Sequence, residues 1–234
     1  ANTAIGYKSG EALTTGHTNV LIGNQSGKSG TVSRYNTVLG AYALDAEVEG
    51  SGNVAIGYNT LTAQNAGGSD GGATETYNTA IGYTAGGAIT SGTENTIVGA
   101  LALDASTVGV QNVAIGAGAL STCNENDNDG AVAVGYKAGF NQASTGRDQY
   151  AASNVHIGWS AGLTMTTGVG SVHVGHASGY FETTGTNNTF VGYDSGRYIQ
   201  GTSNNVFIGA NAGINGETDD AASNTASNNT AVGS

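Results

Sequence analysis

Two histidines, His156 and His173, are 17 residues apart, and this spacing recurs throughout the chain. Imidazole nitrogens bind metal ions or anions when several of them converge. If each 17-residue unit forms one coil of a stack, the two rings lie roughly 5 Å apart, one above the other. The alternative is that they are neutral, wide side chains that fill an interface beside Phe190 and Phe207. We favour this second interpretation, so His156 and His173 are only weak metal candidates.

An acidic segment gives a second weak metal candidate. Residues 125–130, Glu-Asn-Asp-Asn-Asp-Gly, place Asp127 and Asp129 at alternate positions before a glycine, as in the first half of a calcium-binding loop. The position of the glutamate that closes such a loop is occupied by Tyr136. We therefore interpret the segment as a solvated insertion, and the sequence predicts no metal and no cofactor.

A column of aromatic residues is the third feature that could act on a ligand. Tyr58, Tyr83, Tyr136, Trp159 and Tyr193 each follow the glycine of a repeated phrase. Exposed rings in a row can stack against sugars, so these residues are candidate glycan contacts. The alternative, which we favour, is that they pack on one another at a corner of the coil.

The motifs of the common enzyme classes are absent from the sequence. There is no GxSxG, HExxH or CxxC motif and no phosphate-binding loop. The one cysteine, Cys123, has no basic neighbour that would activate its thiol. We therefore predict that the chain is not an enzyme.

The elements that would position these residues follow from a repeat. A phrase such as Asn-Thr-Ala-Ile-Gly-Tyr recurs, and its glycine defines a register of 17 residues. These register glycines are Gly6, Gly23, Gly40, Gly57, Gly82, Gly99, Gly116, Gly135, Gly158, Gly175, Gly192, Gly209 and Gly233. Four insertions, at 62–77, 121–130, 140–153 and 214–228, have the composition of loops. We predict a single all-β solenoid domain over 1–234, with about 13 coils.

The residue before each register glycine is aliphatic, and the residue three before it is always Thr or Val. Side chains two apart in a strand share one face, so these two columns point the same way. Because β-branched residues suit a packed strand, we expect both columns to fill the interior of the solenoid. The expected core ladder is Ile5, Ile22, Leu39, Ile56, Ile81, Val98, Ile115, Val134, Ile157, Val174, Val191 and Ile208.

The residue between these two columns should point to the opposite face, yet it too is mostly apolar. A strand that is covered on both faces has a continuous apolar run. We therefore expect this middle column to pack against another copy of the chain, which predicts a homo-oligomer. The expected interface residues are Leu21, Ile97, His156, His173, Phe190 and Phe207.

An asparagine stands four residues before most of the register glycines. Stacked Asn side chains can hydrogen-bond along a ladder, and the glycine itself fits a tight corner. A second, looser segment that ends in another glycine predicts a second short strand in each coil. The expected Asn ladder is Asn2, Asn19, Asn36, Asn53, Asn78, Asn95, Asn112, Asn154, Asn188 and Asn205.

Composition excludes several classes of partner. The chain has a formal net charge of −11 and only six Lys and Arg residues, with no basic patch. Phosphate neutralisation needs clustered cations, so nucleic acid is not expected as a partner. No apolar run is long enough to cross a bilayer, so no membrane insertion is expected. Abundant Asn, Thr, Ser and Gly with little Lys suit an extracellular protein.

The repeated phrase, N-[TV]-x-[IV]-G-x-x-[AS]-[GL], resembles the YadA-like head repeat of trimeric autotransporter adhesins. It is even more similar to the NTxIGYxAG repeats of bacteriophage tail fibres and fibre-like bacterial surface proteins, since the adhesin repeat is usually shorter than 17 residues. The resemblance implies a left-handed parallel β-roll, assembled as a homotrimer, with a role in attachment. It also implies a place on a virion tail fibre or a bacterial cell surface, and a host glycan or protein receptor as a further partner.

The function expected from these features is a structural, surface-displayed fibre segment that gives a rigid rod for attachment. Because the repeat pattern continues to both ends of the sequence, we expect a segment of a longer fibre, or subunits that stack end to end. Three alternatives stay open: a self-assembling extracellular filament subunit, an ice-binding solenoid and a polysaccharide-degrading spike. An ice-binding face needs a flat exposed array, usually of Thr, whereas the Thr and Val column is expected inside.

Overall fold

The computed structural model describes residues 1–67, 72–123, 129–142, 153–214 and 227–233. The chain divides into two compact units, 1–114 and 115–234, and each is described by itself. Both units are all-β, and no helix in the described residues is long and apolar enough to cross a membrane. Parts of the four predicted insertions lie outside the described residues, as does Asp127.

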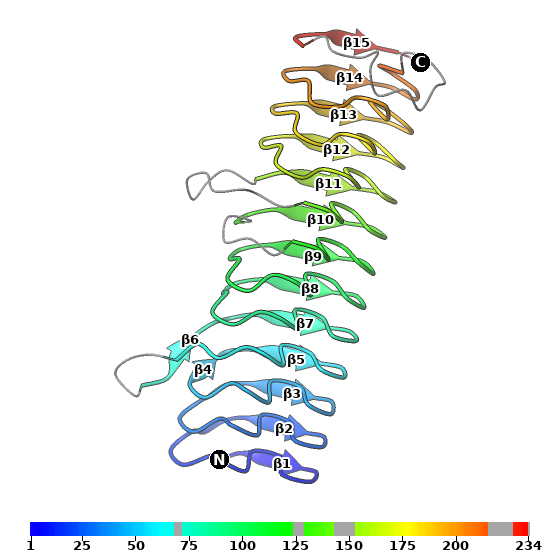
Figure 1. The fold of residues 1–234 in the computed structure, drawn as a ribbon. Helices are drawn as coiled ribbons and strands as arrows, with labels where there is room; N and C mark the ends of the chain where they lie inside the picture. The colour runs from blue at the N-terminus through cyan, green and yellow to red at the C-terminus, as the bar shows by residue number, and fades with distance from the viewer. Residues whose placement is uncertain (68–71, 124–128, 143–152, 215–226, 234) are drawn as a thin grey trace. The chain divides into compact units, whose positions relative to one another are not determined.

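In unit 1 successive coils contribute short strands to a parallel sheet, and Figure 1 shows these strands lying one above the other. In sheet order they are β1 (Thr3–Ile5), β2 (Val20–Ile22), β3 (Thr37–Leu39), β5 (Val54–Ile56), β7 (Thr79–Ile81), β8 (Thr96–Val98) and β9 (Val113–Ile115), which reaches the boundary of the unit. Residues of equal register pair directly, as Ala4 does with Leu21. Ala55 pairs with Ala80 across the 62–77 insertion, so this loop leaves the register unchanged.

Unit 2 repeats the same arrangement. Its strands, in sheet order, are β10 (Val132–Val134), β11 (Val155–Ile157), β12 (Val172–Val174), β13 (Thr189–Val191), β14 (Val206–Ile208) and β15 (Thr230–Val232). Ala133 pairs with His156, and Phe207 pairs with Ala231, each across an insertion. These pairings confirm the predicted parallel β-solenoid and its register.

Most coils contain one strand and not the two that the sequence predicted. In the described residues only β4 (Gly50–Ser51) and β6 (Thr74–Glu75) form a second, two-stranded parallel sheet. Elsewhere the second segment still bonds to the next coil, as from Thr14 N to Thr31 O at 3.0 Å. Turns and bends interrupt these bonds, so the consecutive pairs that define a ladder do not form.

The interior of both units is filled by the middle residue of the strands, so the predicted facing was wrong. Val38 and Ile97 are fully buried, whereas Ile5 and Leu39 are 59% and 47% exposed. Alternation along a strand fixes which residues share a face, but it does not say which face is inside. None of the expected core ladder is buried: Ile5, Ile22, Leu39, Ile56, Ile81, Val98, Ile115, Val134, Ile157, Val174, Val191 and Ile208 all lie on the outside of the sheet.

The packing of two columns of interior side chains explains which face of the strands is buried. The residue four after a register glycine is Gly or Leu in nearly every unit, and it lies beside the middle residue of its own coil, of the next coil, or of both. A Cβ on Gly139, for example, would come 2.7 Å from Cδ2 of His156. Where the position is Leu, as at Leu61, the next middle residue is Ala, as at Ala80. A narrow, close-packed interior requires this match of large with small side chains.

The Asn column forms a buried hydrogen-bonded ladder, as expected. Oδ1 of Asn78 accepts the backbone N–H of Asn95 at 2.9 Å, and Nδ2 of Asn95 donates to the carbonyl of Gly109 at 2.8 Å. Where Ser171 replaces asparagine, its hydroxyl accepts the backbone N–H of Asn188 at 3.2 Å. Bonds of this kind engage Asn2, Asn19, Asn36, Asn53, Asn78, Asn95, Asn112, Asn154, Asn188 and Asn205. The ladder holds the corner of successive coils in register.

Candidate functional site

One face of the sheet in each unit is apolar and uncovered in the single chain. It consists of the first and third residues of the three-residue strands, which are all the strands except β4 and β6, and we call it the outer sheet face. Its first column holds only Thr and Val, and its second column holds only Ile, Leu and Val. Ile157 and Ile208, for example, are 39% and 41% exposed. Contiguous exposed apolar surfaces are a common feature of protein interaction sites.

The residues expected at an interface lie inside the coils, which is a further correction. The side chains of Leu21, Ile97, His156, His173, Phe190 and Phe207 are all buried within the solenoid. The two Phe rings stack on each other with centroids 5.2 Å apart. The middle column is therefore the core, and the columns on either side of it form the outer sheet face.

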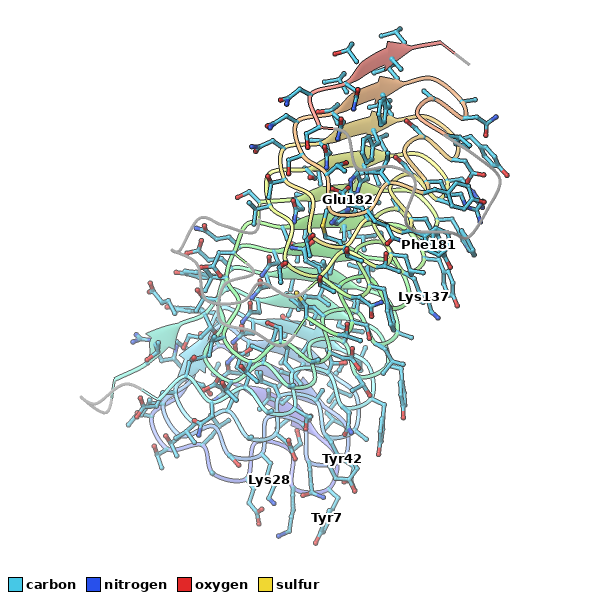
Figure 2. All side chains as sticks on the ribbon, turned by 45° about the horizontal axis from the view of Figure 1, so that its top comes forward. Tyr7, Lys28, Tyr42, Lys137, Phe181 and Glu182 are labelled. Carbon is cyan, nitrogen blue, oxygen red and sulfur yellow. The ribbon has the colours of Figure 1, made fainter. Side chains whose placement is uncertain are left out.

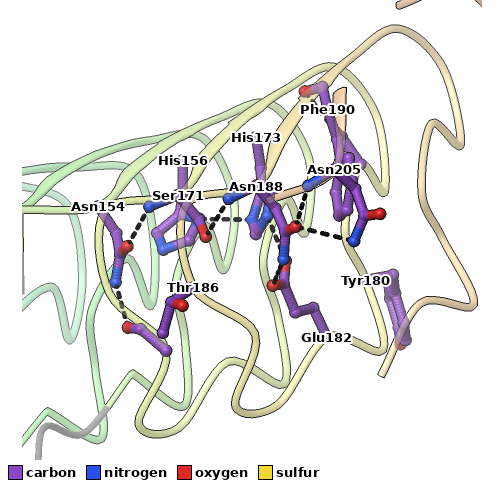
Figure 3. A network of polar contacts seen from close by, with 12 residues as sticks. Asn154, His156, Ser171, His173, Tyr180, Glu182, Thr186, Asn188, Phe190 and Asn205 are labelled. Carbon is purple, nitrogen blue, oxygen red and sulfur yellow. Dashed lines mark hydrogen bonds and ion pairs between the residues drawn. The ribbon is translucent and has the colours of Figure 1, made fainter. Parts of the chain in front are cut away.

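The two histidines belong to a buried polar network in unit 2, drawn in Figure 3. Nδ1 of His156 lies 3.1 Å from Nδ1 of His173, and Nε2 of His156 lies 2.9 Å from Oε1 of Gln142. Nε2 of His173 lies 2.6 Å from Oε2 of Glu182, and Nδ2 of Asn188 donates to Oε1 of the same carboxylate. All five side chains are almost completely buried. The strands β11 and β12 set the spacing of the imidazoles, because His156 and His173 are paired residues.

Burial decides the electrostatics of this network. The absence of solvent, and then the neighbouring His173, hold the pKa of His156 well below its ordinary value. A carboxylate such as Glu182 cannot remain inside a protein without a cationic or hydrogen-bonding partner, and His173 supplies one. Each ring nitrogen of both histidines therefore faces a polar atom. Two of these contacts are hydrogen bonds, whereas Nε2 of His173 and Oε2 of Glu182 form a short ion-pair contact without hydrogen-bond geometry.

The geometry does not bring together a larger set of metal ligands. Among the described residues, no group of three or more His, Cys, Asp or Glu side chains could hold a metal ion. Asp129 is half-buried, whereas Asp127 lies outside the described residues. Cys123 is buried and free, and burial raises the pKa of its thiol, which leaves it protonated and unreactive.

The aromatic column lies on the surface and forms stacks. Tyr58 and Tyr83 stack in unit 1 with centroids 5.6 Å apart. In unit 2 Tyr136, Trp159, His176 and Tyr193 form a continuous stack, with centroid separations of 6.2, 4.7 and 4.9 Å. The predicted glycan contacts Tyr58, Tyr83, Tyr136, Trp159 and Tyr193 are each about half exposed. Because neighbouring rings cover much of one another, the stacks present mainly ring edges to solvent.

Figure 2 shows which of the labelled side chains extend outward from the coils and which lie inside them. Tyr7 and Tyr42 extend away from the coils of unit 1, and Phe181 extends from those of unit 2, whereas Glu182 lies among the coils.

Sequence reasoning missed Gln142 and Glu182 as partners of the histidines. Both stand seven residues after a register glycine, in a column that mixes buried polar residues such as Glu47 and Gln64 with apolar ones such as Met165 and Ile199, so the sequence of this column alone did not single them out.

Comparisons with protein-family models, with curated proteins and with solved structures find no match to this chain. The geometry of the outer sheet face and of the buried network therefore carries the functional argument.

Proposed function

We propose that this chain is a structural, non-enzymatic fibre segment that assembles side by side with copies of itself through the outer sheet face. The carrying observation is that this face is apolar, regular and exposed in the single chain. Burying aliphatic side chains stabilises association by about 25 cal/mol per Å² of apolar surface removed from water. Leaving a ladder of Ile, Leu and Val in water would forgo that stabilisation at every coil.

A second copy of the chain is the occupant that fits this face best. The strands of each unit repeat with the spacing of a parallel sheet, about 4.8 Å. Only a surface with the same period stays in register over many coils, and another copy has that period by construction. No charged residue originates from the face to oppose such packing.

The finer form of the proposal is a left-handed roll of about 13 coils, arranged as a homotrimer around the outer sheet faces. Support comes from the 13 register glycines and from the resemblance of the repeat to those of trimeric adhesins and phage tail fibres. Such a rod would be extracellular, on a virion tail fibre or a bacterial cell surface, and would serve attachment to a host glycan or protein. The low count of Lys and Arg argues against nucleic acid as a partner.

The mass of the particle in solution tests this proposal. Light scattering on the purified chain should give three chain masses, and substitution of Ile157 by Glu should lower the mass by placing a charge in the outer sheet face. The matched control is Asn204→Asp, which adds the same charge at an exposed residue outside the strands and should leave the mass unchanged. Circular dichroism confirms that each variant is folded, and a wild-type monomer at micromolar concentration would overturn the proposal.

An ice-binding solenoid is the second candidate, because the Thr and Val column is exposed and not internal. Thr3, Thr37, Thr79 and Thr96 lie on the outer sheet face of unit 1, each in a separate strand. The neighbouring column has no Thr, which is why we rank this function second. A monomer with thermal hysteresis would favour it, whereas trimers without hysteresis would eliminate it.

Two further functions are outcomes of simple assays. Long filaments in electron micrographs of the same sample would indicate a self-assembling filament subunit. Release of reducing ends from bacterial surface polysaccharides would indicate a degrading spike and would contradict the non-enzymatic proposal.

A further inference from the structure

The column that holds His156 and His173 does not need polar residues to fold. In the coils on either side the same position is occupied by Ala133 and by Phe190, and both are buried. The ring of Phe190 stacks on His173 with centroids 5.2 Å apart, so a ring of similar width fits this part of the interior. The histidines therefore distinguish these two coils from neighbours whose interior is apolar at the same position.

The polar contacts of the network define how many protons it holds. Three contacts link Gln142 to His156, His156 to His173, and His173 to Glu182, and each needs one hydrogen between its heavy atoms. Since Oε1 of Gln142 only accepts, Nε2 of His156 donates to it, and Nδ1 of His156 must then accept from Nδ1 of His173. The third hydrogen lies between His173 and Glu182. Wherever that hydrogen resides, the network has no net charge.

An additional proton cannot enter this arrangement without breaking it. It would place an N–H on both Nδ1 atoms, which face each other at 3.1 Å with no acceptor between them. The ionisable groups in contact with the rings are each other and Glu182. Gln142 approaches from the coil below and Phe190 from the coil above, and neither titrates. The buried site would then carry an uncompensated positive charge.

We propose that the buried network of Gln142, His156, His173 and Glu182 is an acid-sensitive element that stabilises the coils of unit 2. The network stabilises these coils while it has no net charge, and it destabilises them when it binds one further proton. This inference does not depend on the fibre role. It identifies a pH-sensitive element within the solenoid that changes state under mildly acidic conditions without any ligand.

The direction of the effect follows from proton linkage. In the folded chain the pKa of His156 is lowered, and in the unfolded chain it returns to about 6.5. The stability contributed by neutral His156 is therefore present above pH 6.5 and is lost as the pH falls below it. One proton is taken up on unfolding, so the equilibrium constant of unfolding rises up to about tenfold per pH unit.

The test compares the wild type with an apolar variant across pH 4.5–8. In the variant, Gln142→Met, His156→Phe, His173→Phe and Glu182→Ile introduce residue types found in the same columns at Met165, Phe190, Phe207 and Ile199. Urea unfolding is measured at one fixed protein concentration. The ratio of wild-type to variant unfolding constants should rise by up to about tenfold per pH unit as the pH falls below 6.5. A ratio that is independent of pH would overturn the proposal.

Two further measurements complete the design. His176→Gln removes a partly exposed imidazole of the same unit that lies outside the network, 3.6 Å from Asp194, and should retain the rise below pH 6.5. If the apolar variant does not fold, the carbon-bound ring protons of His156 are followed by NMR in the intact wild type. They should not titrate while the protein remains folded between pH 5 and 8. Titration of His156 near its ordinary value in the folded chain would overturn the proposal.

Discussion

The carbonyl oxygen of Gly175 occupies the space that a Cβ on Gly158 would need. Gly158 also has a φ of +135°, a backbone conformation that L side chains rarely adopt. Gly6 and Gly23 stand in the same relation in unit 1. The register glycines are thus a column in which the backbones of successive coils approach too closely for any side chain.

Substitution of Gly158 by Ala should therefore be among the most damaging single changes in unit 2. We expect the free energy of unfolding to fall by about 3 kcal/mol, from backbone strain together with the clash with Gly175. Gly67→Ala is the control, because no atom lies within 4 Å of the added Cβ and its φ is not in the left-handed region. Urea unfolding followed by circular dichroism measures both, and equal effects would contradict this account.

The Asn ladder gives a second prediction. Asn95 is buried, receives the backbone N–H and side-chain amide of Asn112, and donates to Gly109. Asn95→Ala leaves these groups unpaired and should lower the free energy of unfolding by about 3 kcal/mol. Asn95→Ser should cost about half as much, because Ser171 keeps one ladder bond in the same column. Glu94→Gln, at the exposed residue before it, should have little effect, and an Ala variant as stable as this control would contradict the prediction.

The match between the two interior columns gives a third prediction. Leu61→Gly should cost about 3 kcal/mol by leaving a cavity, and Ala80→Ile should cost about 2 kcal/mol by overpacking. The double variant recreates the pair of Gly86 with Ile97, so it should be more stable than the sum of the two changes by about 2 kcal/mol. A double-mutant cycle from urea unfolding measures this coupling. Strict additivity would show that the two side chains do not share the same space.

The aromatic stack of unit 2 gives a fourth prediction. The ring of Trp159 lies between Tyr136 and His176, so a sugar ring has little access to its faces. Trp159 is the only tryptophan, and its fluorescence therefore reports on this stack alone. We expect no saturable change in its emission when bacterial oligosaccharides are titrated into the protein. A saturable change would instead support Trp159 as a glycan contact.

The solenoid and its register could be predicted because the repeat is set by positions that hardly vary. Register glycines such as Gly6 and Gly158 are required by the approach of two backbones, and the Asn column is required by the ladder, so both can be recognised in a single unit. A single unit does not show which face of its strand is buried. Ile5 and Ala4 are both compatible with a core, and the choice between them depends on the residue that another coil presents.

The missing signal was a correlation between successive units. Leu61 is followed by Ala80, whereas Gly139 is followed by His156, and only a comparison of the two positions reveals that they share one interior space. The partners of the histidines were missed for a similar reason. Glu182 is distant from any motif, and its importance arises from the fold, which brings its carboxylate to His173.

The insertions leave the pairing of the flanking strands intact, as Ala55 with Ala80 and Phe207 with Ala231 show. The loop carried by a coil and the number of coils can therefore change independently during evolution. A gene of this kind can gain, lose or exchange a loop at one bend while selection on the neighbouring coils continues unchanged. It can also lengthen by duplication of one unit, because a new coil has to fit only the coils that it touches.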